Sequence, residues 1–158
     1  MEYRIRPFRD EDADILAEII HTAIAVIGPR AYSPAQVRAW AARHPGPERF
    51  LERNARSDAI IVAARSDDRA VAYVIVESDG HVDHLYCDPA HTRRGLAEHL
   101  LAQVDTLAQD AGTTRLYTEA SELARPAFER AGYRVTQRRD FSIDGVAIHN
   151  FAMEKAPG

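Results

Sequence analysis

Residues 81–101, with the sequence HVDHLYCDPAHTRRGLAEHLL, constrain the fold more than any other stretch of this chain. An apolar strand is predicted at Val82–Cys87, because turn residues bound it on both sides. A tight loop at 91–97 follows, with two arginines and one glycine. The residues after the loop predict a helix, since apolar side chains recur along one helical face. Gly112 stands at the expected C-cap. The apolar face is made of Leu100, Leu101, Val104, Leu107, Ala108 and Ala111.

The loop at 91–97 has the features of an anion site. The first N–H groups of a helix have no partner within the helix. Gly95 leaves these groups open to an anion, and the helix dipole adds about half a positive charge. Arg93 and Arg94 add full charges beside it. We therefore predict that the loop holds a phosphate or pyrophosphate, the alternative being an ordinary turn with solvated arginines.

Two common phosphate motifs are excluded. A Walker A loop requires G-x-x-x-x-G-K-[ST], and the chain contains no such run. The dinucleotide fingerprint requires G-x-G-x-x-G, whereas this loop has only Gly95. The predicted anion site therefore needs another explanation.

Composition narrows the class of protein. The 158 residues suffice for one domain with a core of its own, which we place at 1–158. A formal net charge of −4 argues against a broad nucleic-acid surface. The single cysteine, Cys87, excludes an internal disulfide and is typical of a reducing compartment. No apolar run approaches the roughly 20 residues of a membrane span, and the N-terminus lacks a signal segment. We expect a cytoplasmic protein that contacts neither nucleic acid nor membrane.

The remaining elements are predicted from periodicity and turn residues. A strand at Tyr3–Pro7 is followed by a helix that ends at Gly28, and Ser33 begins a second helix with a capping box. A hairpin precedes the central strand, and the turn Asp144-Gly145 joins a second hairpin at the end. The further elements are a helical segment at 48–54, strands at 60–64, 70–77 and 115–119, a helix at 123–131, and strands at 133–141 and 146–153. The resulting order is β-α-α-β-β-β-α-β-α-β-β.

The central stretch resembles the acetyl-CoA loop of the GNAT superfamily of N-acyltransferases. That family reaches the loop from a strand reading roughly L-Y-V-x-P, and here the strand reads L-Y-C-D-P. The loop pattern is [QR]-x-x-G-x-[GA], and here it is T-R-R-G-L-A, so Gly95 and Ala97 match. Thr92 departs from the pattern, although its hydroxyl can still donate a hydrogen bond. The order of elements is also that of the family, so the resemblance covers nearly the whole chain.

This resemblance implies an α/β (α+β) fold with a mixed, mostly antiparallel sheet of about seven strands and flanking helices. The two central strands, Val82–Cys87 and 115–119, would be parallel and splay apart, so that the pantetheine arm of acetyl-CoA enters between them. Backbone N–H groups left unpaired there would bind the acyl carbonyl. No metal is implied. The implied cofactor-binding residues are Leu85, Tyr86, Cys87, Thr92, Arg93, Arg94, Gly95, Leu96, Ala97 and Phe128.

Two further stretches, AYSPAQVRAWA and LYTEASELARPAFERAGY, resemble the YafP-like branch of bacterial acetyltransferases. The implied activity is transfer of an acetyl group from acetyl-CoA to a primary amine, by direct attack in a ternary complex. One alternative is a GNAT-like module that binds acyl-CoA without turnover. Another is an enzyme of a different class that uses the loop for another phosphate ligand. The amine, a small molecule or a peptide, is left open, as is the choice between monomer and homodimer.

The transfer requires a group that accepts a proton from the amine. Strand alternation places His81 and Asp83 on one face of the central strand, opposite to His84 and Tyr86. By the resemblance to the GNAT family, His81 and Asp83 match positions at which several GNAT enzymes place base residues. We therefore rank Asp83 and His81 first as catalytic candidates. The alternatives are a structural carboxylate or substrate contact for Asp83 and a solvated strand-edge residue for His81.

Glu119 and Tyr117 share a face of the next central strand and rank after these two, with helix capping as the alternative for Glu119. The general acid departs from the family pattern. Many GNAT enzymes carry a tyrosine four residues before a glycine that corresponds to Gly132, and here that place is Phe128. Water, Tyr117 or the stability of the thiolate itself would then serve. Cys87 is expected to pack in the core rather than to act as a nucleophile.

The acceptor groove of the family lies between the first two helices and the last hairpin. This implies Tyr32, Trp40 and Asn150 as substrate-binding residues, with His149 beside them, although all four fit structural roles equally well. The two carboxylates ranked above favour a cationic amine.

Overall fold

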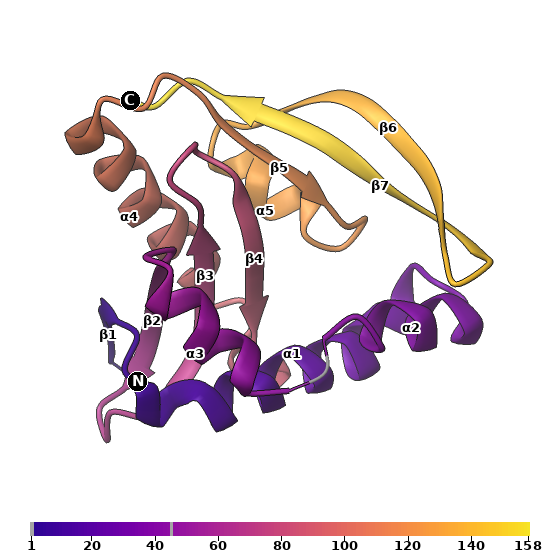
Figure 1. Cartoon of the computed structure of the whole chain (residues 1–158), viewed down its shortest axis with the longest axis horizontal. Helices are drawn as coiled ribbons and strands as arrows, with labels where there is room; N and C mark the ends of the chain where they lie inside the picture. Colours follow the sequence, from indigo (N-terminus) through magenta and orange to yellow (C-terminus); the bar gives the residue numbers. More distant parts are fainter. Residues whose placement is uncertain (1, 45) are drawn as a thin grey trace.

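The described residues, 2–44 and 46–158 of this computed structural model, form seven strands and five α-helices (Figure 1). Short 3₁₀ helices lie on either side of the first helix and before the loop at 91–97. The strands are β1 (Tyr3–Pro7), β2 (Ala59–Arg65), β3 (Ala70–Val76), β4 (Val82–Cys87), β5 (Leu116–Ala120), β6 (Arg134–Ile143) and β7 (Val146–Lys155). The helices are α1 (Ala13–Ile27), α2 (Pro34–Ala41), α3 (Glu48–Ala55), α4 (Leu96–Ala111) and α5 (Arg125–Arg130).

The strands form two antiparallel sheets that touch at one place. The first sheet has the order β1-β2-β3-β4 and the second the order β5-β7-β6. Among the described residues, one parallel bridge, between His81 and Tyr117, connects them, and the Tyr117 N–H donates to the Gly80 carbonyl at 3.1 Å. Thr118 Oγ1 donates to the Val82 carbonyl at 2.7 Å. Beyond this contact β4 and β5 diverge (Figure 1), which confirms the splayed pair that the family resemblance implied.

A β-bulge interrupts β4 where it pairs with β3. Val76 lies opposite Val82, whereas Ile75 lies opposite His84. One step along β3 therefore corresponds to two steps along β4, and Asp83 is the extra residue. An extra residue reverses the alternation of side chains in the rest of the strand.

The bulge corrects the expectation that His84 and Tyr86 point away from Asp83. The three side chains share one face: His84 Nε2 lies 3.7 Å from Asp83 Oδ2, and Tyr86 lines the same cavity as Asp83. Leu85 and Cys87 pack instead against the core beneath α4. The physical reason is that the bulge shifts the register of β4 by one residue relative to uninterrupted alternation.

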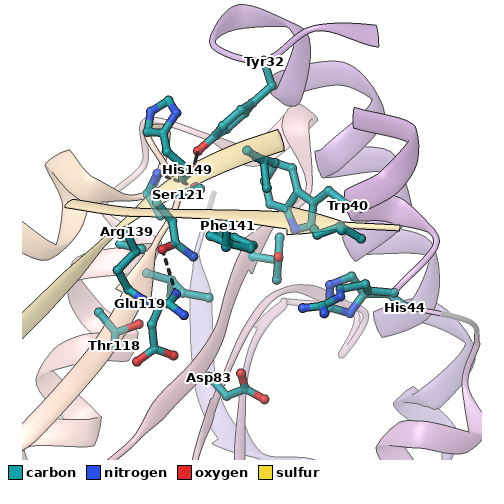
Figure 2. Close-up of a pocket in the computed structure, with 18 of the residues that line it drawn as sticks. Tyr32, Trp40, His44, Asp83, Thr118, Glu119, Ser121, Arg139, Phe141 and His149 are labelled. Carbon is teal, nitrogen blue, oxygen red and sulfur yellow. Dashed lines mark hydrogen bonds between the residues drawn. The ribbon is translucent and has the colours of Figure 1, made fainter. Parts of the chain in front are cut away.

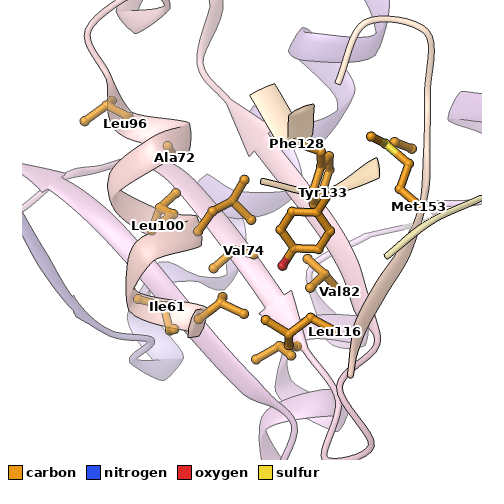
Figure 3. Close-up of a cluster of buried hydrophobic side chains, with 14 of the residues drawn as sticks. Ile61, Ala72, Val74, Val82, Leu96, Leu100, Leu116, Phe128, Tyr133 and Met153 are labelled. Carbon is orange, nitrogen blue, oxygen red and sulfur yellow. The ribbon is translucent and has the colours of Figure 1, made fainter. Parts of the chain in front are cut away.

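Hydrophobic cores lie on both faces of the first sheet. α1 covers one face with buried side chains such as Leu16 and Ile20. α4 covers the other face, where Leu100 packs with side chains of the first sheet (Figure 3). Each such fully buried side chain stabilises the fold by roughly 1.5–3 kcal/mol. Leu107 was expected on the buried face of α4, but it is 37% exposed because it lies at the margin of the apolar stripe. No helix of the described ranges is long and apolar enough to cross a membrane.

α2 is fixed against the hairpin of β6 and β7. Ser33 Oγ accepts from the Gln36 N–H at 3.2 Å, and Gln36 Oε1 accepts from the Ser33 N–H at 2.8 Å, which forms the predicted capping box. Gln36 Nε2 also donates to the Ala147 carbonyl at 2.9 Å. The hairpin turns at Asp144 and Gly145, which both have positive φ, as a tight two-residue hairpin turn requires. These contacts hold the second sheet across from the first.

Candidate active site

The basic loop (residues 91–97) leads into α4 with the first amides of the helix left open. Gly95 is the N-cap, with φ of +75°, and among the described residues no side chain caps the first turn. A Cβ added to Gly95 would meet no described atom within 4 Å. Arg93 and Arg94 are exposed beside it. Open amides, free space and two guanidinium groups are the arrangement that a pyrophosphate needs.

His91, the first residue of the basic loop, fixes the start of the loop against β1. Its ring is buried, its Nδ1 lies 2.8 Å from the Tyr3 hydroxyl, and the two rings meet edge to face. Thr92, the residue that departs from the family pattern, donates its hydroxyl to the Pro89 carbonyl at 3.2 Å. The Thr92 hydroxyl therefore stabilises the turn itself, and the amides of α4 and the arginines are left to bind an anion.

Two cavities meet in the gap between β4 and β5. The loop cavity, of about 160 Å³, reaches the basic loop at Thr92 and Ala97 and is also lined by Cys87. The hairpin cavity, of about 390 Å³, lies between α2, the two diverging strands and the β6–β7 hairpin (Figure 2). The shared walls place the two cavities side by side. Residues lining both are Trp40, Leu85, Tyr86, Ser121 and Ala124.

Backbone amides of β4 face this gap. The Asp88 N–H donates to the Val71 carbonyl in β3 at 2.7 Å. Backbone groups of successive residues point to opposite edges of a strand. The N–H groups of Leu85 and Cys87 are therefore directed away from β3 and toward the gap, and Tyr86 contributes its ring instead. A buried N–H is costly when unpaired, so these two amides are suited to a ligand that supplies carbonyl oxygens.

Cys87 faces the loop cavity as a protonated thiol. Burial raises the pKa of Cys87 to about 12. The thiol donates to the Asp88 carbonyl, with 3.4 Å between Sγ and the oxygen. Because the thiolate is the nucleophilic form of cysteine, this side chain has little nucleophilic character at neutral pH.

Aromatic side chains form one wall of the hairpin cavity. Tyr32 and Trp40 meet edge to face, with ring centres 5.6 Å apart. The Tyr32 hydroxyl donates to the His149 carbonyl at 3.0 Å and accepts from the Glu122 N–H at 2.8 Å, so both of its hydrogen-bonding roles are taken within the protein. The groove residues expected from the sequence, Tyr32, Trp40, His149 and Asn150, are brought together in this cavity.

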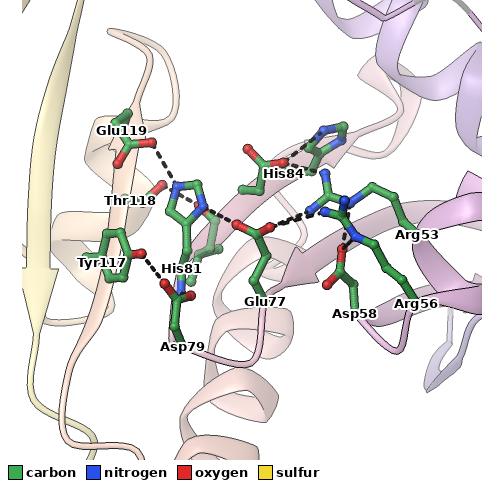
Figure 4. A network of polar contacts seen from close by, with 12 residues as sticks. Arg53, Arg56, Asp58, Glu77, Asp79, His81, His84, Tyr117, Thr118 and Glu119 are labelled. Atoms are coloured by element: carbon green, nitrogen blue, oxygen red, sulfur yellow. Dashed lines mark hydrogen bonds and ion pairs between the residues drawn. The ribbon is translucent and has the colours of Figure 1, made fainter. Parts of the chain in front are cut away.

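His81 lies behind the hairpin cavity, between two carboxylates (Figure 4). Its Nε2 is 2.8 Å from Glu119 and its Nδ1 is 2.5 Å from Glu77. The hydrogen bond to Glu119 raises the pKa of His81, burial opposes it and Glu77 adds to it, giving a value of about 9. His81 is therefore an imidazolium at neutral pH and donates to both carboxylates. Glu119, but not His81, reaches the cavity wall.

Asp83 lines the same cavity and is paired with Arg53 of α3. Arg53 is 5% exposed and lies 2.9 Å from Asp58 as well. Burial alone would raise the pKa of Asp83, but the neighbouring His84 and the Arg53 guanidinium lower it on balance. Asp83 therefore stays ionised, and its charge is largely balanced by a permanent cation.

Tyr117 and Phe128 differ in their relation to the cavity. The Tyr117 hydroxyl donates to Asp79 at 2.5 Å, which raises the pKa of Tyr117 to about 12, and its ring stacks on His81 outside the cavity wall. Phe128 does line the hairpin cavity, although it is only 2% exposed. Its ring meets Tyr133 edge to face at 5.0 Å. The ring at position 128 thus has no hydroxyl to donate a proton.

The sequence prediction missed several residues of the site, among them Arg53, His44 and Arg139. Arg53 holds Asp83, His44 lines the cavity, and Arg139 projects into it from β6 (Figure 2). Burial lowers the pKa of His44 to about 4, so its imidazole is neutral at physiological pH. The one usable signal was the two-residue spacing of Arg139 and Phe141, which places both on one face of a strand. Within the described ranges, no group of His, Cys, Asp and Glu side chains is arranged to hold a metal ion.

Comparison with known proteins agrees with this geometry. The profile of the Acetyltransferase (GNAT) domain matches residues 29–155. Uncharacterized N-acetyltransferase YafP of Escherichia coli (strain K12) is 29% identical over 154 residues, which cover 98% of this chain and 96% of the relative. A crystal structure of a GCN5-related N-acetyltransferase from Rhodopseudomonas palustris is 27% identical, with a TM-score of 0.89 over 99% of this chain and 96% of that one. PaiA N-acetyltransferase from Thermoplasma acidophilum, solved in complex with coenzyme A, shares the fold at 18% identity, with a TM-score of 0.79 and 99% of each chain covered. The chain therefore belongs to the GNAT family of acetyltransferases.

Proposed function

We propose that this acetyltransferase moves an acetyl group from acetyl-CoA directly to a primary amine while both substrates are bound. One observation carries the proposal: the gap between β4 and β5 adjoins the basic loop through one cavity and opens to carboxylates through the other. The cofactor would enter from the loop cavity and the amine from the hairpin cavity. The two reacting groups would then meet beside Leu85.

The residues present fit the cofactor. The space at Gly95 and the open amides of α4 suit its pyrophosphate, with Arg93 and Arg94 as counter-charges. The amides of Leu85 and Cys87 suit the acyl carbonyl and the pantetheine amides. That PaiA, a protein of the same fold, is solved with coenzyme A supports this assignment.

When bound, acetyl-CoA supplies a thioester whose acyl carbon accepts the lone pair of the amine and whose sulfur leaves as a thiolate. We assign the proton of the amine to Glu119, directly or through a water. Its partner His81 is an imidazolium that donates hydrogen bonds to Glu119 and to Glu77. Asp83 faces the same cavity, but its partner Arg53 holds its protons at any accessible pH. We therefore assign Asp83 to positioning the amino group.

The departing thiolate needs no acidic side chain in this scheme. A thiol has a pKa near 8.5, so its thiolate is a good leaving group at neutral pH, and water suffices to protonate it afterwards. Phe128 offers no proton, and the Tyr117 hydroxyl is already bound to Asp79. The raised pKa of Cys87 favours direct transfer over a covalent intermediate on the protein.

Glu119→Gln tests the assignment. It should lower kcat at saturating acetyl-CoA by at least about 100-fold, because proton transfer by a side chain contributes about 10²- to 10⁴-fold. The affinity for coenzyme A, measured by calorimetry, should stay the same. Asp83→Asn should mainly raise the KM for the amine. Glu154→Gln, at a carboxylate paired with Arg115 on the far part of β7, is the matched control and should change neither value.

An acyl-CoA-binding module without turnover is the second candidate, and Phe128 is the observation that favours it. Single-turnover release of the CoA thiol with a panel of amines separates the two. Tight acetyl-CoA binding without thiol release for any amine would support the module. Equal kcat for Glu119→Gln and the wild type would remove Glu119 from the proton transfer.

A further inference from the structure

Arg139 brings a positive charge into the hairpin cavity without a balancing carboxylate. Among the described residues, no carboxylate forms an ion pair with its guanidinium, which is half-buried. Its Nη1 donates to Oδ1 of Asn150, the residue directly opposite on β7, at 2.9 Å. The guanidinium carbon also lies 5.2 Å from the centre of the Phe141 ring. A neutral amide and an aromatic face thus fix the position of Arg139 and leave its charge available.

Neighbouring arginines are neutralised within the protein. Arg138, the preceding residue on the exposed face of β6, lies 3.3 Å from Asp140. Arg53, on the other side of the cavity, is paired with Asp58 and Asp83. Partial burial of a guanidinium without a counter-charge costs free energy. A ligand that supplies an anion would recover that cost at Arg139.

The carboxylates of the cavity already have cationic partners. Asp83 is paired with Arg53, and Glu119 is paired with the His81 imidazolium. Arg43 also lines the cavity. A simple monoamine would add a further positive charge to this balance. An acceptor that carries an anionic group of its own as well as an amine matches these charges better than a monoamine does.

We propose that the acceptor is a zwitterion of the amino acid type, with an amine, a carboxylate and an aromatic or apolar side group. Arg139 would bind the carboxylate through its free N–H groups. Glu119 and Asp83 line the same cavity (Figure 2), where they would bind the amino group. The volume of about 390 Å³ lies in the range of small-molecule sites, and the rings of Trp40 and Phe141 line it. This inference rests on the proposed function, because it names the substrate of the same site.

Trp40 provides a direct measurement of binding. It is the single tryptophan of the chain and lines the cavity, so quenching of its fluorescence reports on this site. The protein loaded with coenzyme A is titrated with L-phenylalanine, L-phenylalaninamide and phenethylamine, which share the amine and the ring and differ in the carboxylate. We expect L-phenylalanine to bind at least about tenfold more tightly than the other two, a difference of about 1.4 kcal/mol.

Substitutions then locate the preference. Arg139→Gln keeps a hydrogen-bonding group beside Asn150 and should abolish the preference by weakening only L-phenylalanine. Arg139→Lys should restore part of it, since it keeps the charge without the planar fork. Arg138→Gln is the matched control and should retain the full preference. Melting curves show that each variant is folded.

Equal binding of the three ligands to the wild type, an unchanged preference in Arg139→Gln, or no saturable quenching at all would each overturn the proposal. Thiol release from acetyl-CoA with the same three ligands tests the activity separately. Tighter binding of L-phenylalanine that depends on Arg139, without thiol release, would support the anion-binding site and contradict the proposed acetyl transfer. Equal acetylation of all three would support the transferase and overturn the zwitterionic substrate.

Discussion

The two carboxylates of the hairpin cavity, Asp83 and Glu119, have different partners. Asp83 is paired with the Arg53 guanidinium, which does not release a proton at any accessible pH. Glu119 is paired with the His81 imidazolium, which can release one. The sequence could place both carboxylates near the site from their strands. It could not predict the pairing, because Arg53 is 30 positions from Asp83 and His81 is 38 positions from Glu119. Such contacts depend on how the elements pack.

The His81 network predicts a pH-dependent stability. The pKa of His81 is raised to about 9, so its stabilising contribution is fully present below about pH 6.5 and is lost as the pH rises through 9. His81→Gln should therefore cost about 1–3 kcal/mol of unfolding free energy at pH 6 and little near pH 9.5. Urea unfolding at a series of pH values measures this difference. The exposed His99→Gln is the control, and a cost for His81→Gln that does not vary with pH would contradict the prediction.

Local patterns determine the elements of this fold well. β4 has the bounds Val82–Cys87 that its flanking turn residues predicted, and the capping box at Ser33 begins α2. The bulge at Asp83 had no such signal, since neither glycine nor proline marks it and it exists only in the pairing with Val76. The faces of β4 were therefore misassigned after that point. Arg139 was missed for a related reason: its position in the cavity depends on how β6 packs against other elements, and the strand pattern alone does not show this.

The basic loop yields a prediction at the scale of an element. Gly95→Val should weaken coenzyme A binding by at least about 100-fold, because a branched side chain would fill the space before the open amides of α4. The fold should survive with a loss of about 1–2 kcal/mol, since the change strains a positive φ but meets no described atom within 4 Å. Calorimetry and a melting curve measure both effects.

Gly112→Val is the matched control for the loop. Gly112 has φ of +73°, nearly that of Gly95, and an added Cβ there also meets no described atom within 4 Å. It ends the same helix, so it should show the same loss of stability with unchanged binding. Coenzyme A affinity within about threefold of the wild type in Gly95→Val would show that the loop does not hold the pyrophosphate.

At the scale of the whole molecule, the contact between the two sheets depends on what occupies the gap between β4 and β5. Among the described residues, a single bridge joins β4 to β5, and each strand is otherwise paired only on its other edge. A cofactor in the gap would contact both sheets at once. Ligand concentration should therefore affect the relative order of the two halves of the fold as well as catalysis.

Hydrogen exchange tests this coupling. Acetyl-CoA at about 100 times its Kd should stabilise the protein by about 2.7 kcal/mol and slow exchange at the amides of Leu85 and Cys87. Adenosine 3′,5′-bisphosphate, which lacks the pantetheine arm, should protect the basic loop but leave these two amides unchanged. Amides of β2, paired on both sides, report the global stabilisation, against which the local protection at Leu85 and Cys87 is measured. Protection by acetyl-CoA that stops at the basic loop would contradict the placement of the pantetheine arm in the gap.

The divergence of β4 and β5 also bears on self-association. An unpaired strand edge is a template for pairing with another chain, and proteins usually shield such edges at the rim of a sheet. This fold keeps two of them at its centre, on either side of a gap. A ligand that occupies the gap satisfies the same backbone groups that a neighbouring chain would otherwise recruit. Bound acetyl-CoA would then shield the unpaired edges of β4 and β5 as well as take part in the reaction, so a higher acetyl-CoA concentration would reduce aggregation.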